Sequence, residues 1–317
     1  MIGILKSLFG NSSETQESAE EKTKKKNFDI LKYDGIKAMR IGKTGYAIRC
    51  FKEALAIEEE FETLSYLAGI YAQESRTEEA IESYSRLHEI APAHNETLLK
   101  RAQLYFSLQQ IPEVIGDCNA IIAINNKMHE AYLLIAKAKQ IAGQKEEAIA
   151  DLDQAITLKE DWMEAYLQRA RIKFEMQRYD EAREDTEKTI SLSPEEESAL
   201  MLKASIYEAI GQKEKAIEEY QAVIEVNPFY EQAYLEASRL LAGLGKTEEA
   251  LHLLDEALEM KPDFLRGFRT RGELRKQLGD TAGADADFRE AEKLSAETEE
   301  TDKQPVNFND MYANRPL

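Results

Sequence analysis

The sequence predicts an all-α protein, an α-solenoid in which eight helical hairpins follow one another along the chain. Three observations lead to this prediction. The sequence repeats with a period of 34 residues, the spacing between Pro194, Pro228 and Pro262. Small residues recur at two fixed positions of each repeat, and glycine and proline recur where helices would end. A short hairpin cannot bury its apolar face alone, so such units become stable by stacking on their neighbours.

The composition excludes several classes of protein. The 317 residues are 43% hydrophobic, which is enough for a packed core. No run approaches the roughly 18 apolar residues that a membrane-spanning helix needs. The net charge of -19 repels phosphate backbones, so nucleic acid is not an expected partner. Two cysteines, Cys50 and Cys118, cannot form a disulfide framework and indicate a reducing compartment, so we expect a cytoplasmic protein.

The chain starts with a short apolar segment, MIGILKSLFG, over residues 1–10. Four of its apolar residues fall on one face of a helix: Ile2, Leu5, Leu8 and Phe9. The segment lacks the basic start and small-residue cleavage site of a secretory signal. Residues 11–26 carry almost no apolar side chains and are expected to be a flexible linker. Residues 1–27 are therefore predicted to be an apolar segment plus a polar linker, with any membrane contact confined to residues 1–10.

Residues 28–298 are predicted to form the repeat array. The repeats begin at residues 28, 61, 95, 129, 163, 197, 231 and 265. Counted from the start of each repeat, position 8 is always small: Gly35, Ala68, Ala102, Ala136, Ala170, Ala204, Ser238 and Gly272. Position 20 is alanine in every repeat except the third, which has Val114. Small residues at both positions let the two helices of a hairpin approach closely.

Glycine and proline mark the predicted ends of the helices. Position 15 is glycine in five repeats: Gly42, Gly143, Gly211, Gly245 and Gly279. A helix C-terminus favours glycine there because the residue takes a left-handed conformation. Position 32 is proline in four repeats, at Pro92, Pro194, Pro228 and Pro262, and these prolines end the second helix.

This pattern resembles the tetratricopeptide repeat family, whose unit is a 34-residue helix–turn–helix. The resemblance covers residues 28–298 and implies a right-handed superhelix in which the first helices line a concave groove. Residues 299–317 are then a polar tail with a possible capping segment around Phe308, Met311 and Tyr312. That segment could instead lie in the groove or be disordered.

Opposite charges recur at two positions that should face each other within a repeat. Position 7 is basic and position 23 is acidic in four repeats. A guanidinium facing the second helix is tolerated when a carboxylate pairs with it. We predict the ion pairs Arg101–Asp117, Arg169–Asp185 and Arg271–Asp287, with a looser pair Lys203–Glu219. The alternative is that these long side chains extend to solvent.

No motif for catalysis, a metal or a cofactor is found, so the protein is predicted not to be an enzyme. The four histidines, His88, His94, His129 and His252, have no metal-ligand spacing, and His88 and His94 are expected at the surface. Cys118 falls at a core position and Cys50 beside one, so buried, inert thiols are expected.

The family resemblance implies which residues face the groove. Its positions 2, 5, 6, 9, 12 and 13 line the concave wall, and in the third to seventh repeats they include Leu99, Lys100, Gln103, Phe106, Leu133, Lys137, Gln140, Leu167, Arg171, Phe174, Met201, Leu235 and Arg239. These are the candidate partner-binding residues. The leucines at position 5 could instead pack between neighbouring first helices, as solenoid interfaces often do; that interpretation fits Phe106 and Phe174 less well.

The wall is predicted to be locally positive in a negative chain. Positions 5, 6, 9, 12 and 13 carry eight basic residues, namely Lys32, Arg40, Lys100, Lys137, Arg171, Arg239, Arg269 and Lys276. The same positions carry four acidic residues, namely Glu175, Glu208, Glu236 and Glu273. A suitable ligand is an extended or helical peptide with apolar and acidic groups, bound with salt-sensitive affinity.

The function predicted from the sequence is a non-catalytic protein–protein interaction scaffold that binds a peptide or helical segment of a partner. The alternative is a peripheral membrane-associated assembly or regulatory factor that uses residues 1–10. A small-ligand or enzymatic function would need convergent polar groups in a closed pocket, which an open groove does not promise. The sequence leaves the partner's identity and the oligomeric state open.

Overall fold

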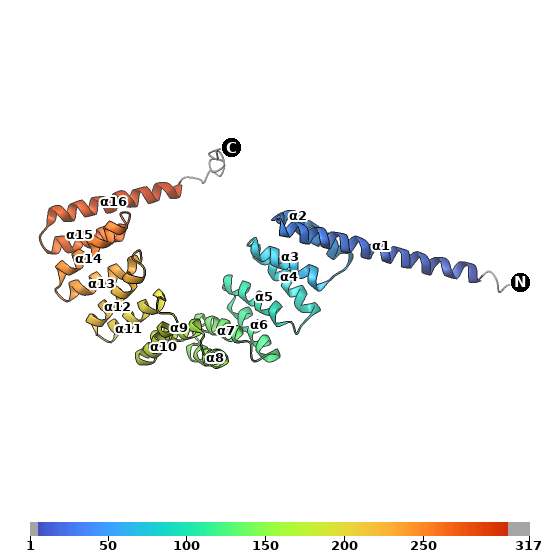
Figure 1. Ribbon diagram of the computed structural model, residues 1–317, viewed down its shortest axis with the longest axis horizontal. Coiled ribbons are helices and arrows are strands. Elements are labelled where there is room, and N and C mark those ends of the chain that lie inside the picture. Colours follow the sequence, from blue (N-terminus) through green and yellow to red (C-terminus); the bar gives the residue numbers. More distant parts are fainter. Residues whose placement is uncertain (1–5, 304–317) are drawn as a thin grey trace. The chain divides into compact units, whose positions relative to one another are not determined.

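The computed structural model describes residues 6–303, with side chains over residues 19–297. This part of the chain is all-α: it forms sixteen helices and no strand. The chain divides into two compact units, Met1–Glu160 and Asp161–Leu317. Both units consist of four consecutive helical hairpins (Figure 1). The predicted fold class is confirmed.

The hairpins follow the predicted repeats closely. In the first unit the helices are α1 (Lys6–Arg40), α2 (Thr44–Ile57), α3 (Phe61–Gln73), α4 (Thr77–Ile90), α5 (Asn95–Ser107), α6 (Ile111–Ile124), α7 (His129–Ile141) and α8 (Lys145–Leu158). In the second they are α9 (Met163–Glu175), α10 (Tyr179–Leu192), α11 (Glu197–Ala209), α12 (Lys213–Val226), α13 (Glu231–Gly243), α14 (Thr247–Met260), α15 (Leu265–Gln277) and α16 (Thr281–Lys303). From α3 to α15, each first helix begins at the first residue of its predicted repeat.

Packing within each unit is local. The two helices of a hairpin pack on each other, and inside a unit each second helix packs on the first helix of the next hairpin. Each repeat therefore contacts only its neighbours along the chain, which is the arrangement of a solenoid.

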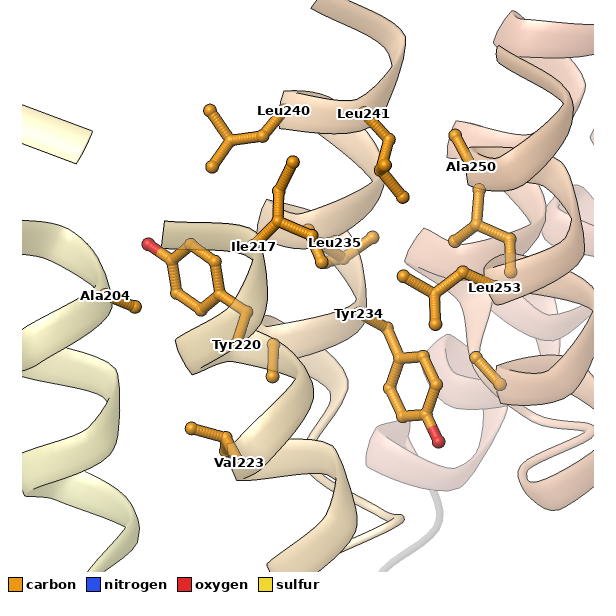
Figure 2. Packing of buried hydrophobic residues seen from close by; sticks show 14 of the residues in the cluster. Ala204, Ile217, Tyr220, Val223, Tyr234, Leu235, Leu240, Leu241, Ala250 and Leu253 are labelled. Atoms are coloured by element: carbon orange, nitrogen blue, oxygen red, sulfur yellow. The ribbon is translucent and has the colours of Figure 1, made fainter. Parts of the chain in front are cut away.

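The core is built from side chains that alternate between these layers. In the second unit, Tyr220 of α12 lies in one buried cluster with Ala204 of α11 and with Leu235 and Leu240 of α13 (Figure 2). Ala204 is fully buried, and Tyr220 is exposed by only 2%. Position 8 is small because the large residue at position 24 covers it, as the sequence pattern indicated.

Two repeats have glycine at position 8, because the side chain at position 24 leaves no room there even for a Cβ atom. A Cβ atom added to Gly35 would lie 2.5 Å from the Phe51 ring, and one added to Gly272 would lie 2.8 Å from the Phe288 ring. Real Cβ atoms do not approach that closely, so even alanine is excluded unless the ring moves. In these two repeats the hairpin closes around a phenylalanine at position 24.

The turn inside every hairpin has the same backbone, with or without glycine. The five glycines at position 15 have φ between 71° and 86°. The other three repeats have Ser75, Gln109 and Gln177 at this position, with φ of 57°, 57° and 60°. The same hydrogen bonds close both kinds of turn: Gln144 N donates to Lys139 O, and Gln110 N donates to Tyr105 O. The left-handed conformation belongs to the repeat rather than to glycine.

The first helix corrects one expectation. Residues 11–26, expected to be a flexible linker, form part of the continuous helix α1, which runs from Lys6 to Arg40. Glutamate, lysine, alanine and glutamine are strong helix formers, and Glu20 precedes Lys24 at the favourable i, i+4 spacing. Once the packed part of α1 has nucleated the helix, each added residue costs little. The polarity of residues 11–26 indicated a linker, but their helix propensity favours the helix that is observed.

The two ends of the chain leave some predictions open. α16 extends to Lys303, so residues 299–303 of the predicted polar tail continue the helix. The possible capping segment at residues 305–317 and the side chains of residues 1–10 lie outside the described parts, so their predicted roles stay predictions. Between residues 6 and 303, no helix is both long enough and apolar enough to cross a membrane.

Candidate peptide-binding face

The first helices line the inner side of each unit. α1 contacts α3 and α5 contacts α7 in the first unit, and α9 contacts α11 and α13 contacts α15 in the second. Consecutive second helices are not in comparable contact. A stack curves toward the side on which its helices approach most closely, so the first helices lie on the concave side. We call this surface of each unit the inner face.

Four of the candidate binding residues support the inner face from within. Leu99, Leu133, Leu167 and Leu235 are exposed by only 6–9%. Leu99 lies in a buried cluster with Ala131 of the next first helix, and Leu235 lies in one with Phe264. The alternative interpretation, packing between neighbouring repeats, therefore describes these two leucines. The predicted apolar surface at position 5 is mostly buried.

The other apolar candidates are half-buried. Phe106 packs against the cluster formed by Val114, Cys118 and Ile135, and the Phe174 ring lies 5.7 Å from the Tyr179 ring. Met201 packs against the core of the second unit. Each of the three keeps part of its side chain accessible, so each offers some apolar contact area to a ligand.

The polar candidates provide most of the accessible surface. Lys100 and Gln103 of α5, Arg171 of α9 and Arg239 of α13 are exposed, while Lys137 and Gln140 of α7 are half-buried. Within the described part of the chain, neither Lys100 nor Arg171 forms an ion pair. These two side chains are therefore available to a partner.

Two of the basic residues predicted on the inner face are paired with carboxylates of this chain. Lys32 Nζ lies 2.7 Å from Glu60 and 2.5 Å from Glu62. Burial alone would lower the pKa of Lys32, but its hydrogen bonds to these carboxylates outweigh burial and raise it. Arg239 similarly pairs with Glu208 at 2.6 Å and Glu236 at 2.8 Å. The expected excess of positive charge is therefore smaller than the residue count suggested.

The four predicted ion pairs within repeats are confirmed. Arg101 and Asp117 form two parallel hydrogen bonds of 2.9 and 2.7 Å, and Arg169 and Asp185 form two of 2.8 and 2.5 Å. Arg271 binds Asp287 in the same way at 3.1 and 2.6 Å. Lys203 Nζ makes a single contact of 2.7 Å with Glu219. These basic residues stabilise the array and are not part of the inner surface.

Further cations, not predicted from the sequence, join these pairs from position 11, one helical turn after position 7. Lys173 Nζ lies 2.8 Å from Asp185, and Arg275 donates to Asp287 at 3.0 Å. In the fourth repeat, position 7 is Ile135, and Lys139 at position 11 pairs with Asp151 at 2.7 Å instead. Burial still raises the pKa of Asp151. The sequence does contain a signal for these pairs. Positions 7 and 11 have the i, i+4 spacing that places both on one face of the first helix, opposite the acidic residue at position 23.

The cysteine and histidine side chains, which could be reactive, have structural surroundings. Cys50 and Cys118 are both buried, and burial raises the pKa of Cys118 to about 12, with added repulsion from Asp117 and Asp151. His88 and His94 are half-buried rather than at the surface. His94 caps α5, because its Nδ1 accepts from Thr97 N. Over the described side chains, no group of three or more His, Cys, Asp or Glu residues is placed to hold a metal ion.

The fold and this face define a class of protein: a helical-repeat solenoid whose units each present a face of first helices. Comparison with known sequences identifies the repeat. Profiles of the tetratricopeptide repeat match residues 129–161, 167–233 and 231–264. These matches show that the segments 129–161 and 167–264 are tetratricopeptide repeats, and the remaining hairpins continue in the same register.

Solved structures share the fold at low sequence identity. The C-terminal part of a TPR repeat-containing protein from Cytophaga hutchinsonii is 18% identical with a TM-score of 0.62, covering 74% of this chain and 95% of that one. A tetratricopeptide repeat protein from Parabacteroides merdae is 20% identical with a TM-score of 0.59, covering 74% and 94%. YrrB is 16% identical with a TM-score of 0.50, covering 61% and 99%. No curated protein sequence matches this chain.

Proposed function

We propose that this protein is a non-catalytic interaction scaffold that binds an acidic, partly apolar peptide segment of a partner on the inner faces of its repeats. One observation carries the proposal: cations in the packing positions are paired, whereas Lys100 and Arg171 on the inner face are exposed and form no ion pair with any described residue. An exposed cation without a partner costs nothing to leave in water and can pair with an incoming carboxylate.

The surroundings of these cations support the same proposal. Phe174 lies half-buried on the same helix as Arg171, and Phe106 on the same helix as Lys100. A partner segment that alternates apolar and acidic residues would match such a surface. YrrB, which shares the fold, is described as a TPR protein with an unusual peptide-binding site.

The compartment belongs to the proposal as well. Both cysteines are free thiols in the core, which suits a reducing compartment such as the cytoplasm. The net charge of -19 would slow the approach of an acidic segment at long range, while the local cations favour it at contact. We therefore expect affinity to fall when salt screens the contact pairs.

The test uses peptides selected on the intact protein. A display library of random twelve-residue peptides is panned on the wild type, and the affinity of the enriched peptides is then measured for Arg171→Glu/Arg269→Glu. Both residues are exposed on the inner face of the second unit. We expect about a tenfold loss of affinity, because each reversal turns an attraction into a repulsion.

The matched control reverses two exposed lysines of second helices in the same unit, Lys188→Glu/Lys213→Glu, which changes the net charge equally. Affinity should change less than twofold. Equal losses for both double variants, or enriched peptides without acidic residues, would contradict binding at the inner face.

A further inference from the structure

At position 5 the second repeat differs from the four repeats that have a buried leucine there. This position is a buried leucine in the third, fourth, fifth and seventh repeats, but it is Ser65 in the second. Leu99 shows what the leucine does, since it lies in one buried cluster with Ala131 of the next first helix, and Met128 packs against that cluster. Leu235 does the same with Phe264. The leucine at position 5 therefore fills the space between its own first helix and the first helix of the following repeat.

In the second repeat the corresponding space is empty. Ser65 faces His94 and Thr97, the counterparts of Met128 and Ala131, across a pocket of about 270 Å³. The Ser65 hydroxyl donates to Phe61 O at 2.8 Å, so it turns back onto its own helix and does not fill the space. We call this hollow the Ser65 pocket; it lies between α3, α4 and α5 in the first unit.

Part of the wall of the Ser65 pocket is apolar and already in place. Phe61, Tyr84 and Leu87 line it, and Tyr84 and Leu87 are exposed by only 9% and 1%. The Phe61 ring meets the His94 ring edge-on, with centroids 4.9 Å apart, and His94 is held in turn by Thr97. Such fixed aromatic walls need no rearrangement to receive an apolar group.

The rim of the pocket is polar and has unused capacity. Lys100 and Glu96 line it and are exposed, and neither forms an ion pair with a described residue. The Tyr84 hydroxyl makes no hydrogen bond to any described residue. Burial raises the pKa of Tyr84, and the negative charge of Glu96 raises it further. The rim can therefore accept a backbone amide near Glu96 and a carboxylate near Lys100.

We propose that the Ser65 pocket takes a leucine-sized aliphatic side chain from an extended segment of a partner protein, with a neighbouring carboxylate of that segment paired to Lys100. The partner's side chain replaces the leucine that this repeat lacks. At about 270 Å³ the pocket is smaller than the roughly 300–1,000 Å³ of pockets that hold drug-sized ligands, so it suits a single side chain. The inference rests on the proposed function and adds the anchor point of the bound segment.

The experiment uses two fluorescent heptapeptides as probes, Gly-Ser-Asp-Leu-Asp-Ser-Gly and the same peptide with alanine in place of leucine. Fluorescence anisotropy measures their binding to the full chain. We expect the leucine peptide to bind about tenfold more tightly, because its side chain is buried in the pocket. Ser65→Leu should abolish this difference by filling the pocket from within, and Ser65→Ala, which leaves it empty, should keep it.

Two further measurements define the mechanism. Ser65→Leu should raise the urea midpoint of the unliganded protein, because it fills a void in the manner of the other repeats. A lowered midpoint would mean that the space does not fit a leucine, which overturns the proposal. Lys100→Gln should weaken both peptides about fivefold and keep their ratio.

The remaining outcomes separate this inference from the proposed function. Equal binding of the two heptapeptides to the wild type, or no binding of either, overturns the Ser65 pocket as an anchor. The proposed function is then tested separately, by the binding of the selected peptides to the Arg171→Glu/Arg269→Glu variant. Both of these residues lie in the second unit, whereas the Ser65 pocket lies in the first. If a chain ending at Lys303 binds the leucine peptide much more tightly than the full chain does, the occupant is the chain's own tail and not a partner.

Discussion

At the scale of single residues, the charges of the chain separate into two groups with different roles. Arg101, Arg169 and Arg271 point into the hairpins, where each is held by two hydrogen bonds to an aspartate. Lys100 and Arg171 point away from the hairpins into solvent. A buried charge is stable only with a partner, whereas an exposed one needs none. Position within the repeat therefore decides whether a base stabilises the fold or is available for binding.

The fifth repeat gives the sharpest test of the buried pairs. Asp185 is 4% exposed and binds both Arg169 and Lys173. Asp185→Asn removes the buried carboxylate that the half-buried Arg169 and the buried Lys173 share, so we expect a loss of about 3–5 kcal/mol in the free energy of unfolding. Urea denaturation followed by circular dichroism measures it.

The matched comparison for that variant is Glu219→Gln in the sixth repeat. Its pair with Lys203 is single and more exposed, so about 1 kcal/mol is expected. Equal losses at the two sites would show that burial does not govern the strength of these pairs.

Position 5 illustrates the limit of residue-scale prediction. The family resemblance implied that Leu99 and Leu235 face the inner side, and the sequence left open whether a ligand or the next repeat covers them. The structure shows that the next repeat does. Only the distance between successive first helices decides this, and no pattern within a single repeat contains that distance.

At the scale of secondary-structure elements, the turn between the two helices is the most uniform feature of the repeat. Its left-handed residue is glycine in five hairpins, and Ser75, Gln109 or Gln177 in the others. A residue with a Cβ atom is strained in this conformation by about 1 kcal/mol relative to glycine. Three of the eight turns therefore carry strain that glycine would remove.

Substitution at two turns tests this point in opposite directions. Gln109→Gly should raise the free energy of unfolding by about 0.5–1 kcal/mol, and Gly143→Ala should lower it by about 1 kcal/mol. No heavy atom lies within 4 Å of a Cβ added to Gly143, so backbone conformation alone would cause the loss. Urea midpoints of the two variants provide the measurement; a change of the same sign in both would refute the explanation.

The first helix, α1, begins well before the residues that pack it against the core. Among the side chains of α1 that the structure describes, Phe28 is the first in the core, yet the helix begins at Lys6. Propensity and charge spacing carry it beyond the packed region, because extending an existing helix costs far less than starting one. A prediction based on apolar content places the boundary at the core residue and misses the extension.

At the scale of the whole molecule, stability is a sum over neighbouring repeats. Each unit contains four hairpins and its own buried clusters, such as the one that runs from Leu200 to Leu274. In a solenoid, three or more repeats are enough to bury a continuous core. The core of the second unit should therefore form without the first.

Residues 161–317 expressed alone should give a helical circular dichroism spectrum and a cooperative urea transition. A single repeat, residues 163–196, is the control and should be unfolded, because isolated short hairpins cannot bury their apolar faces. A coil-like spectrum for the four-repeat fragment would show that its hairpins depend on contacts beyond their own unit.

The sequence by itself determined the local architecture: the 34-residue period, the small residues at positions 8 and 20, the start of each first helix from α3 to α15, and the aspartate opposite each arginine at position 7. These follow from helix geometry and from contacts within one hairpin, which a repeat encodes in its own residues. Only the tertiary structure decided which inner-face residues are accessible. Leu99 is covered, Lys32 is neutralised and Ser65 leaves a pocket, and each outcome depends on residues of the neighbouring repeat. The gap between two repeats is set by the packing of all their side chains together, so it belongs to no single repeat's sequence.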